Sequence, residues 1–472
     1  MYFWKNIIKN KANFIFYKNN KKYIKSIKQV LLDARKIYKP LKIDSANLIF
    51  LEGYNDISFF LNYLFFLENE NPVFLLDKNP KKAYLKNLIK KFKPSYCILQ
   101  NSSNLEKYEE REKFLFKNNY DFTLLKFDEK KISNKDLRFL IPTSGSTSQS
   151  KFVKLSKNNI DFITKQISTR LEISKNETVM TTLPPNYVYG LSVINCHLFV
   201  GTNIVINNFS PIEKKFWDLI HKEKIKTISG VPYTYEIFDK LKIYKSNLKH
   251  LKKFTQAGGE LSTDIKSKFL DYCKKHKKKF YVMYGQTEAA SRITILDFLN
   301  LESKIKSIGK PINKGILYPV DKRQKRIIKP YQEGELVYEG KNIMMGYCEN
   351  LKELNQNNTI KRLFTGDIGY FDKENFFFIT GRKNRIVKIF GTRINLSDLE
   401  NDFIKNKLKT CLLFKHNKIY IFIQNKKLEK KVLNVINERI NLNKLIFKIK
   451  ILKHFPRNNN DKINYNKLQK LV

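Results

Sequence analysis

A loop rich in hydroxyl side chains is the first segment of this sequence that could do chemistry. The stretch IPTSGSTSQSKFVKLS, residues 141–156, follows a short apolar run. Its glycine permits close backbone approach, and the neighbouring residues offer hydroxyl and N–H donors. The loop predicts a phosphate cradle made by Thr143, Ser144, Gly145, Ser146 and Thr147. It is not a Walker A loop, because GxxxxGK[ST] is absent. A loop of this composition can also be merely solvated, so the other motifs decide.

Two later stretches carry side chains that suit a nucleotide. YGQTEAA, residues 284–290, follows an apolar run and sets an aromatic ring, a hydroxyl and a carboxylate within five residues. A ring can stack on a base, a hydroxyl can donate to a phosphate, and a carboxylate can bind Mg²⁺. FTGDIGYFD, residues 364–372, places Asp367 between two glycines, where it can accept two hydrogen bonds from a ribose diol.

Two cationic residues complete the set. Arg382 follows the stretch that contains Asp367, and Lys462 lies in the polar terminal segment PRNNNDKINYNKL, residues 456–468. Each signal is weak alone, because an aspartate in a turn is commonly only a turn residue. The occurrence of all these motifs in this order along one chain favours a nucleotide site.

The elements that must position these residues alternate between strand and helix. Apolar runs predict strands that are separated by helical, Lys-rich stretches. They are residues 46–53, 72–77, 95–100, 178–184, 202–207, 226–232, 252–259 and 278–285. Ser156 is the predicted N-cap of the next helix. This alternation favours an α/β fold with mixed and parallel sheets flanked by helices.

The pattern changes toward the C-terminus. Short strands and glycine turns begin near residue 333 and predict a small barrel-like region. The tail predicts a separate, mobile α+β unit. We therefore expect a large domain over residues 1–383 and a small domain over residues 384–472.

Composition limits the remaining possibilities. The chain has 472 residues, 42% of them hydrophobic, which is enough for a large core and excludes a disordered protein. The five cysteines have no CxxC spacing, so we expect neither zinc nor disulfides and a cytoplasmic location. The first twenty residues mix Lys and Asn into apolar positions, and no run is long enough to predict a membrane span.

The net charge of +46 would suit a nucleic-acid partner. The lysines, however, are spread along the whole chain together with abundant Asn, Ile, Phe and Tyr. A biased composition explains this pattern, so we expect no specific nucleic-acid binding.

Taken together, the motifs resemble the adenylate-forming superfamily of acyl-CoA synthetases, carrier-protein-loading adenylation domains and luciferases. The resemblance covers the chain from about residue 141 to its end. The opening loop is similar to the family's phosphate loop, [ST]SG[ST]TGxPKG, and retains Gly145, Thr147 and Lys151. It departs from that pattern where Gly, Pro and Gly are usual, at Ser148, Ser150 and Phe152.

The resemblance also implies roles for the later motifs. QAGGELS, residues 256–262, is similar to the adenine-slot segment and includes Gly258, Gly259 and Glu260. In YGQTE it implies that Tyr284 contacts the adenine, Thr287 the α-phosphate and Glu288 the Mg²⁺. Asp367 and Arg382 match the ribose-binding pair, and Lys462 matches the catalytic lysine, although Asp461 replaces the usual glycine before it.

The small domain and the acid pocket are implied in the same way. Asn384 stands at the hinge position, and Lys388 and Gly391 match the segment used for thiol capture. LPPNYVYGLSVINCHL, residues 183–198, matches the acyl-pocket segment, which would place Asn186, Tyr187, Tyr189 and Gly190 beside the substrate. Amino-acid-activating members carry an Asp in this segment, and this chain has none there. A buried ammonium without a partner would be costly, so a simple acyl, hydroxyacyl or aryl acid is favoured.

The sequence thus predicts an AMP-forming acid–thiol ligase that uses ATP and Mg²⁺. The acid is activated as an acyl-adenylate with release of pyrophosphate, and then transferred to a thiol. CoA and the phosphopantetheine of a carrier protein both remain open as acceptors. The alternatives are a catalytically weakened nucleotide-binding relative, an amino-acid-activating enzyme and a basic nucleic-acid-binding protein.

Overall fold

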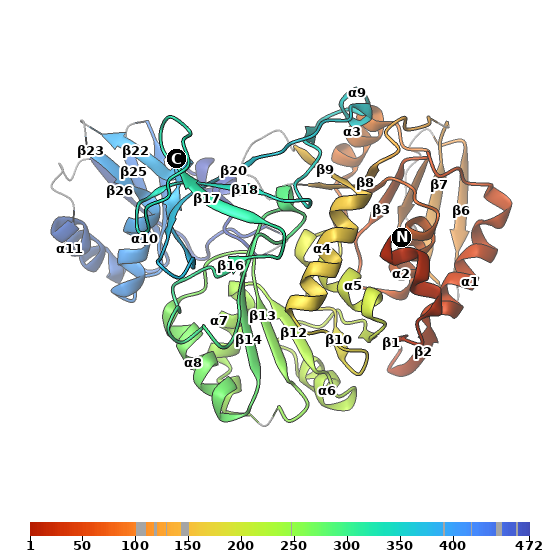
Figure 1. Ribbon diagram of the computed structural model, residues 1–472, viewed down its shortest axis with the longest axis horizontal. Coiled ribbons are helices and arrows are strands. Elements are labelled where there is room, and N and C mark those ends of the chain that lie inside the picture. Colours follow the sequence, from red (N-terminus) through yellow and green to blue (C-terminus); the bar gives the residue numbers. More distant parts are fainter. Residues whose placement is uncertain are drawn as a thin grey trace. The chain divides into compact units, whose positions relative to one another are not determined.

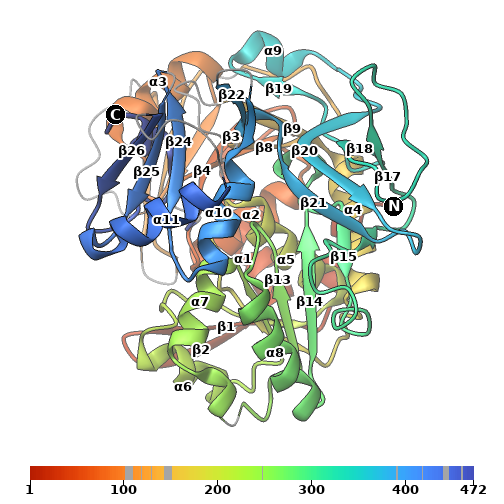
Figure 2. The same cartoon turned by 90° about the vertical axis from the view of Figure 1, so that its left-hand side faces the viewer.

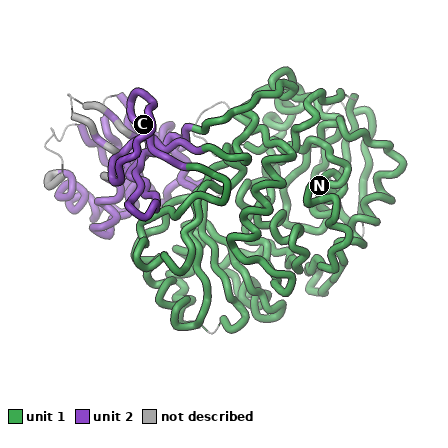
Figure 3. Tube along the Cα trace, viewed as in Figure 1, with its two compact units in different colours: residues 1–143, 150–316, 339–363 green, residues 144–149, 317–338, 364–472 purple. Residues whose placement is uncertain are grey.

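The chain forms two compact units, which are described separately. The computed structural model describes residues 1–100, 110–117, 120–128, 130–142, 151–246, 248–389, 392–416, 418–439, 446–458 and 461–472. The first unit consists of the described residues within 1–143, 150–316 and 339–363, and the second of those within 317–338 and 364–472 (Figure 3).

A nine-stranded mixed sheet forms one half of the first unit. Its strands, in spatial order, are β16 (Lys310–Pro311), β15 (Thr294–Leu296), β14 (Lys279–Tyr284), β13 (Lys253–Gln256), β12 (Thr227–Gly230), β10 (Thr178–Met180), β11 (Asn203–Val205), β1 (Asn13–Lys18) and β2 (Lys21–Ser26). The run from β14 to β1 is parallel, and antiparallel strands extend it at both edges. Helices connect most of the parallel strands, because such strands need a crossover.

An eight-stranded mixed sheet forms the other half of the same unit. Its strands are β19 (Tyr347–Cys348), β9 (Phe152–Ser156), β8 (Leu137–Pro142), β4 (Val73–Leu76), β3 (Ile49–Glu52), β5 (Tyr96–Leu99), β7 (Phe122–Lys126) and β6 (Glu112–Phe116). Its central strands are parallel and fully buried, which explains why they read as continuous apolar runs.

Helices between and outside the two sheets complete the first unit (Figure 1). A single apolar cluster joins the sheets through α2 (Ile57–Glu68), α4 (Lys157–Arg170) and α5 (Val188–Val200). The remaining helices of the unit are α1 (Ile27–Tyr38), α3 (Lys82–Phe92), α6 (Lys214–Lys222), α7 (Pro232–Lys240), α8 (Thr263–Lys275) and α9 (Leu351–Asn355). Because α5 is apolar on nearly every side, it suits the position between two sheets.

The second unit contains three small sheets. A four-stranded sheet is made of β17 (Ile316–Val320), β18 (Gly334–Glu339), β20 (Leu363–Phe371) and β21 (Phe377–Arg382), where a barrel-like region was expected. A two-stranded sheet follows, of β22 (Ile386–Ile389) and β23 (Thr392–Asn395). The last sheet has β24 (Cys411–Lys415), β25 (Lys418–Ile423) and β26 (Phe447–Ile451).

Helices α10 (Leu396–Lys405) and α11 (Glu429–Arg439) lie beside β24 to β26 (Figure 2). Leu399, Phe403 and Val432 of these helices share one buried cluster with Ile419 and Ile421 of the sheet. The final helix is α12 (Tyr465–Gln469). The described residues within 386–472 thus have a core of their own and add no strand to the large sheets.

The α/β architecture and every strand predicted from an apolar run are confirmed. Ser156 caps α4 as expected, since its side chain accepts a hydrogen bond from Asn159 N. The predicted domain boundary between residues 383 and 384 stays a prediction, because the second compact unit also includes most of the four-stranded sheet. Among the described helices, none is long and apolar enough to cross a bilayer.

Candidate nucleotide and acid site

Two predicted nucleotide segments meet at the carboxyl edge of the nine-stranded sheet. Strands β13 and β14 are parallel neighbours with Gln256 opposite Val282, so the residues after each strand emerge at the same edge. Gly258 and Gly259 follow β13, and the Tyr284 segment ends β14. Ligands of open α/β sheets bind outside the carboxyl ends of strands, so this edge is a suitable nucleotide site.

A tyrosine of the predicted acid pocket contacts the glycine segment. Gly258 has a φ of +89°, and a Cβ there would lie 2.5 Å from the Oη of Tyr187. Only glycine fits such a position without strain. Gln256 Nε2 donates to Gly259 O at 2.9 Å, and Glu260 lies exposed beyond it. The structure therefore brings the predicted adenine segment and the start of the predicted acid segment together.

The YGQTE stretch forms a tight turn. A Cβ on Gly285 would come within 2.1 Å of Ser291 O, so a side chain there would clash with backbone. Thr287 and Glu288 lie in a short 3₁₀ helix, η4 (Thr287–Ala289), and both are half-buried. This turn presents a hydroxyl and a carboxylate directly after the strand.

Glu288 is held by a tyrosine that the sequence analysis missed. Tyr347 Oη donates to Glu288 Oε1 at 2.9 Å, and Met344 N donates to Glu288 O at 2.8 Å. Burial, together with the Glu288 charge, raises the pKa of the Tyr347 hydroxyl, which stays protonated and remains a donor. In the described part of the chain, the other carboxylate oxygen of Glu288 makes no hydrogen bond or ion pair, which suits a metal ligand.

The same tyrosine links this turn to the end of the hydroxyl-rich loop. Strand β19 pairs with β9, with Tyr347 opposite Val153, and Lys151 Nζ lies 5.7 Å from the Tyr347 ring centroid. Tyr347 thus lies next to two residues that are far apart in the sequence: its hydroxyl contacts Glu288, and its ring lies near Lys151. The predicted cradle residues Thr143, Ser144, Gly145, Ser146 and Thr147 lie outside the described residues.

One departure from the family's loop pattern has a structural reason. Phe152, where glycine is usual, begins β9 and is buried against Phe74 and Phe92, with ring centroids 4.7 and 5.5 Å apart. Its ring completes the core on the outer side of the eight-stranded sheet. Ser148 and Ser150 lie outside the described residues.

The residues of the predicted acid segment do not line one common pocket. Gly190 packs against the chain before α5, because a Cβ there would lie 2.2 Å from Pro184 O. Tyr189 Oη donates to Thr255 O at 3.0 Å and lines a cavity under α5, and Gly190 lines a second, smaller one. Asn186 lines neither of these two cavities, since its Nδ2 donates to Asp77 Oδ1 at 2.7 Å beside the eight-stranded sheet.

In the second unit, the predicted ribose pair is formed. Asp367 lies opposite Arg382 in the β20–β21 ladder, and Arg382 Nε lies 2.8 Å from Asp367 Oδ1. The carboxylate is buried and the guanidinium is largely exposed. Gly366, with a φ of +73° and no heavy atom near its missing Cβ, leaves open space beside the aspartate.

The predicted catalytic lysine lies in a closed turn of the same unit. Lys462 N donates to Asn458 Oδ1 at 3.0 Å, and Asn458 N donates to Lys462 O at 2.9 Å. Asp461 adopts a left-handed φ of 57°, which glycine favours and aspartate tolerates better than most residues. The replacement of the usual glycine is therefore compatible with the turn.

The predicted hinge and thiol-capture residues are only partly described. Asn384 lies in η5 (Lys383–Arg385) and Lys388 in β22, but the surroundings of their side chains lie outside the described part. Gly391 also lies outside it. The hinge and thiol-capture roles stay predictions.

Comparisons with known proteins agree with this arrangement. A probable 4-coumarate–CoA ligase of Dictyostelium discoideum is 30% identical over 303 residues, 60% of this chain and 51% of that protein. A long-chain-fatty-acid–CoA ligase of Bacillus subtilis is 29% identical over 270 residues, 56% of this chain and 47% of that protein. The matched segments thus span about half the length of these relatives.

A solved structure shows the same fold over the full chain. The O-succinylbenzoate coenzyme A synthetase of Bacillus subtilis, in complex with ATP and magnesium ion, has a TM-score of 0.76 at 18% identity and covers 99% of both chains. The family model for AMP-binding enzymes matches residues 57–348, more than half of this sequence. The chain belongs to the AMP-binding enzyme family.

Proposed function

We propose that this protein is an AMP-forming ligase that joins a carboxylic acid to the thiol of CoA. The observation that carries the proposal is the contact of Tyr347, which lies near Lys151 on the eight-stranded sheet, with Glu288 of the YGQTE turn. That turn shares the carboxyl edge of the nine-stranded sheet with the glycine segment. The relatives named above are CoA ligases, which favours CoA over a carrier protein as the acceptor.

The proposed first step needs no general base. A carboxylate is already ionised at neutral pH, so attack on the α-phosphate requires positioning and charge stabilisation. In this proposal, Thr287 orients the α-phosphate, Tyr284 and the Gly258 segment hold the adenine, and Lys462 stabilises the charge that develops. Glu288, oriented by Tyr347, would hold Mg²⁺, which neutralises charge on the phosphates when bound.

The second proposed step uses the C-terminal residues. Thiol attack on the acyl-adenylate would release AMP and form a thioester. By resemblance, Lys388 and Gly391 would face the incoming thiol after rotation at Asn384. A phosphopantetheine arm on a carrier protein remains the alternative acceptor.

An exchange assay tests the proposal directly. Labelled pyrophosphate should enter ATP only when a suitable carboxylic acid is present, and CoA should then trap the acyl group as a thioester. An absence of acid-dependent exchange across a broad panel, with ATP binding retained, would instead support the weakened nucleotide-binding relative. Thioester on a carrier protein but not on CoA would overturn the choice of acceptor.

A further inference from the structure

The two residues that flank the predicted hinge residue Asn384 form ion pairs with different parts of the second unit. Lys383 Nζ lies 2.7 Å from Glu335 Oε2 of β18, in the four-stranded sheet. Arg385 Nη2 lies 2.6 Å from Glu400 Oε2 of α10, the helix beside the three-stranded sheet. The chain therefore passes from one side-chain anchor to another across a single residue.

The pair of Arg385 and Glu400 is shielded from water, whereas the pair before the predicted hinge is not. The two side chains are 17% and 16% exposed. In the pair of Lys383 with Glu335, the lysine side chain is 63% exposed. Exposed pairs are screened and contribute little, and a shielded pair is screened much less. Arg385 is thus the better fixed of the two anchors.

Glu400 connects this arginine to the segment that carries Lys462. Tyr465 Oη donates to Glu400 Oε1 at 3.2 Å, and the Arg385 guanidinium lies 4.7 Å from the Tyr465 ring centroid. Leu412 N, in β24, donates to the same Oε1 at 2.6 Å. One carboxylate thus joins η5, α10, β24 and α12. We call Arg385, Glu400 and Tyr465 the Arg385 triad.

Tyr465 begins α12, three positions after Lys462. The turn that contains this lysine leads directly into the helix: Asn458 N donates to Lys462 O at 2.9 Å, and Asn464 N donates to Pro456 O at 2.8 Å. A shift of the start of α12 is therefore transmitted to the backbone of Lys462.

The predicted thiol-capture segment is held to α10 in another way. Val387 of β22 and Ile394 of β23 share one buried apolar cluster with Leu399 of α10. Leu468 of α12 belongs to a different cluster, with Phe422 of β25. Loss of the ion pair should therefore loosen the turn that contains the lysine and leave the β22–β23 hairpin attached to α10.

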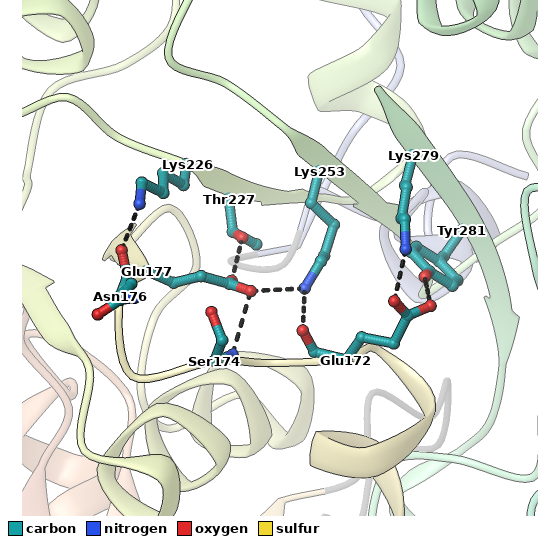
Figure 4. A network of polar contacts seen from close by, with 9 residues as sticks. All are labelled: Glu172, Ser174, Asn176, Glu177, Lys226, Thr227, Lys253, Lys279 and Tyr281. Carbon is teal, nitrogen blue, oxygen red and sulfur yellow. Dashed lines mark hydrogen bonds and ion pairs between the residues drawn. The ribbon is translucent and has the colours of Figure 1, made fainter. Parts of the chain in front are cut away.

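A buried ion pair of the first unit shows a purely structural network (Figure 4). Lys253 Nζ lies 3.0 Å from Glu177 Oε1, and Glu177 also accepts hydrogen bonds from Thr227 Oγ1 at 2.8 Å and Ser174 N at 3.2 Å. Thr227 and Lys253 begin β12 and β13, whereas the predicted nucleotide segments follow the carboxyl ends of their strands. This network therefore lies at the end of the sheet away from those segments.

We propose that Arg385 is a positioning residue that, through Glu400 and Tyr465, fixes the turn of the predicted catalytic lysine to the chain after the predicted hinge. This inference rests on the proposed ligase function, in which Lys462 stabilises the charge that develops during adenylation. Rotation at Asn384 would then carry this lysine and α10 as one body. A displacement of a catalytic group by about 1 Å can cost about 100-fold in rate, so loss of the triad should slow adenylation.

Separate assays of the two half-reactions test the proposal. Arg385→Met should lower the kcat of acid-dependent pyrophosphate exchange by about 10–100-fold. The KM for ATP should change little, because the predicted ribose pair of Asp367 and Arg382 precedes the hinge. Thioester formation from a supplied acyl-adenylate should stay close to the wild-type rate. Arg385→Lys, which keeps the charge, should recover part of the lost exchange.

Matched carboxylate variants separate positioning from lost stability. Glu400→Gln should reproduce the loss of exchange, because it removes the charge that pairs with Arg385. Glu177→Gln removes a buried paired charge of the first unit, so it should be less stable than the wild type yet exchange pyrophosphate at the wild-type rate. Asp402→Asn, two positions beyond Glu400 on α10, breaks a pair with the exposed Lys405 and should also keep that rate.

Amide hydrogen exchange reports on the turn independently of activity. In Arg385→Met, the amides of Asn464 and Leu468 should exchange faster than in the wild type, and those of the β22–β23 hairpin should not. Glu177→Gln should change neither set.

Three results would overturn the positioning role and leave the ligase function standing: unchanged pyrophosphate exchange in Arg385→Met, an equal loss in Glu177→Gln, or unchanged amide exchange at Asn464 in Arg385→Met. A wild-type protein without acid-dependent pyrophosphate exchange would overturn the ligase function, and the positioning role with it.

Discussion

Two buried aspartates lie at opposite ends of one hairpin and differ in what surrounds them. Asp367 lies on β20, faces Arg382 across the ladder and has open space at Gly366. Asp372 follows the same strand and accepts hydrogen bonds from Glu374 N at 3.0 Å and Phe376 N at 2.9 Å. We therefore interpret Asp367 as a ligand-binding group and Asp372 as a turn residue.

Replacement of each aspartate should separate binding from stability. Asp367→Ala should weaken ATP binding by about 1.5–3 kcal/mol, the usual range for hydrogen bonds to a charged acceptor. Asp372→Asn should lower stability and leave ATP affinity unchanged. Titration calorimetry with ATP, combined with thermal unfolding, distinguishes the two effects. Equal ATP affinity in wild type and Asp367→Ala would mean that this residue only stabilises the hairpin.

The buried histidine of α5 should make stability depend on pH. His197 Nδ1 donates to Val193 O at 2.7 Å, and burial lowers the pKa of the ring from 6.5 to about 4. Between these values the unfolded chain binds a proton that the folded chain does not. Stability should therefore fall as pH is lowered from about 6.5 to about 4, by about 3 kcal/mol in total.

A histidine variant isolates this contribution. Glu52 has a pKa raised by burial to about 7, so its own contribution has the opposite sign: stability falls as pH rises from about 4.5 to 7. The difference in free energy of unfolding between wild type and His197→Gln removes the Glu52 effect. That difference should change between pH 6.5 and 4, and a flat difference curve would contradict the buried neutral ring.

At the scale of elements, the position of α5 depends on one close backbone contact. The helix begins after Tyr187, and Gly190 in its first turn faces Pro184 O so closely that a Cβ would lie 2.2 Å away. No rotamer change can relieve a clash between a Cβ and backbone. The start of α5 can therefore pack this closely against Pro184 only because Gly190 has no side chain.

Gly190→Ala should destabilise the first unit by about 1–3 kcal/mol, the usual cost of overpacking a core. Gly259→Ala is a suitable control, since its Cβ would lie 3.2 Å from Pro232 Cγ, a side-chain atom, and its φ is not left-handed. Urea unfolding followed by circular dichroism measures both variants. Similar stabilities for the two would show that α5 can shift at little cost.

At the scale of the whole molecule, the two half-reactions should depend on different residues. Lys462→Ala should lose about 10²–10³-fold in adenylation, comparable with removal of one preorganised electrostatic contact, yet still convert a supplied acyl-adenylate to thioester. Gly391→Leu should do the reverse, because a bulky side chain would block the path of the thiol. Both rates are measured with separate pyrophosphate-exchange and thioester assays.

A neighbouring lysine provides the control for this experiment. Lys467 is exposed on α12, where its backbone N–H donates to Asn464 Oδ1 at 3.0 Å, and Lys467→Ala should leave both half-reactions unchanged. A loss of both steps to the same extent in Lys462→Ala and Gly391→Leu would argue against two separate uses of the C-terminal residues.

Local patterns in the sequence were sufficient to predict many of the elements. The buried parallel strands β3, β4 and β5 appear as apolar runs because both of their faces are covered, and the Ser156 cap depends on residues within three positions. The motifs at residues 256–262 and 284–290 were recognisable because each depends on neighbours in sequence.

Contacts between distant segments were decided only by the tertiary structure. Strand β1 pairs with β11, with Phe14 opposite Ile204, and no local pattern predicts which strand a given strand will join. Tyr347 was missed for the same reason, because it meets Glu288 across 59 positions of the sequence. Residue type and spacing determine local conformation, whereas burial and long-range pairing arise only when the whole chain packs.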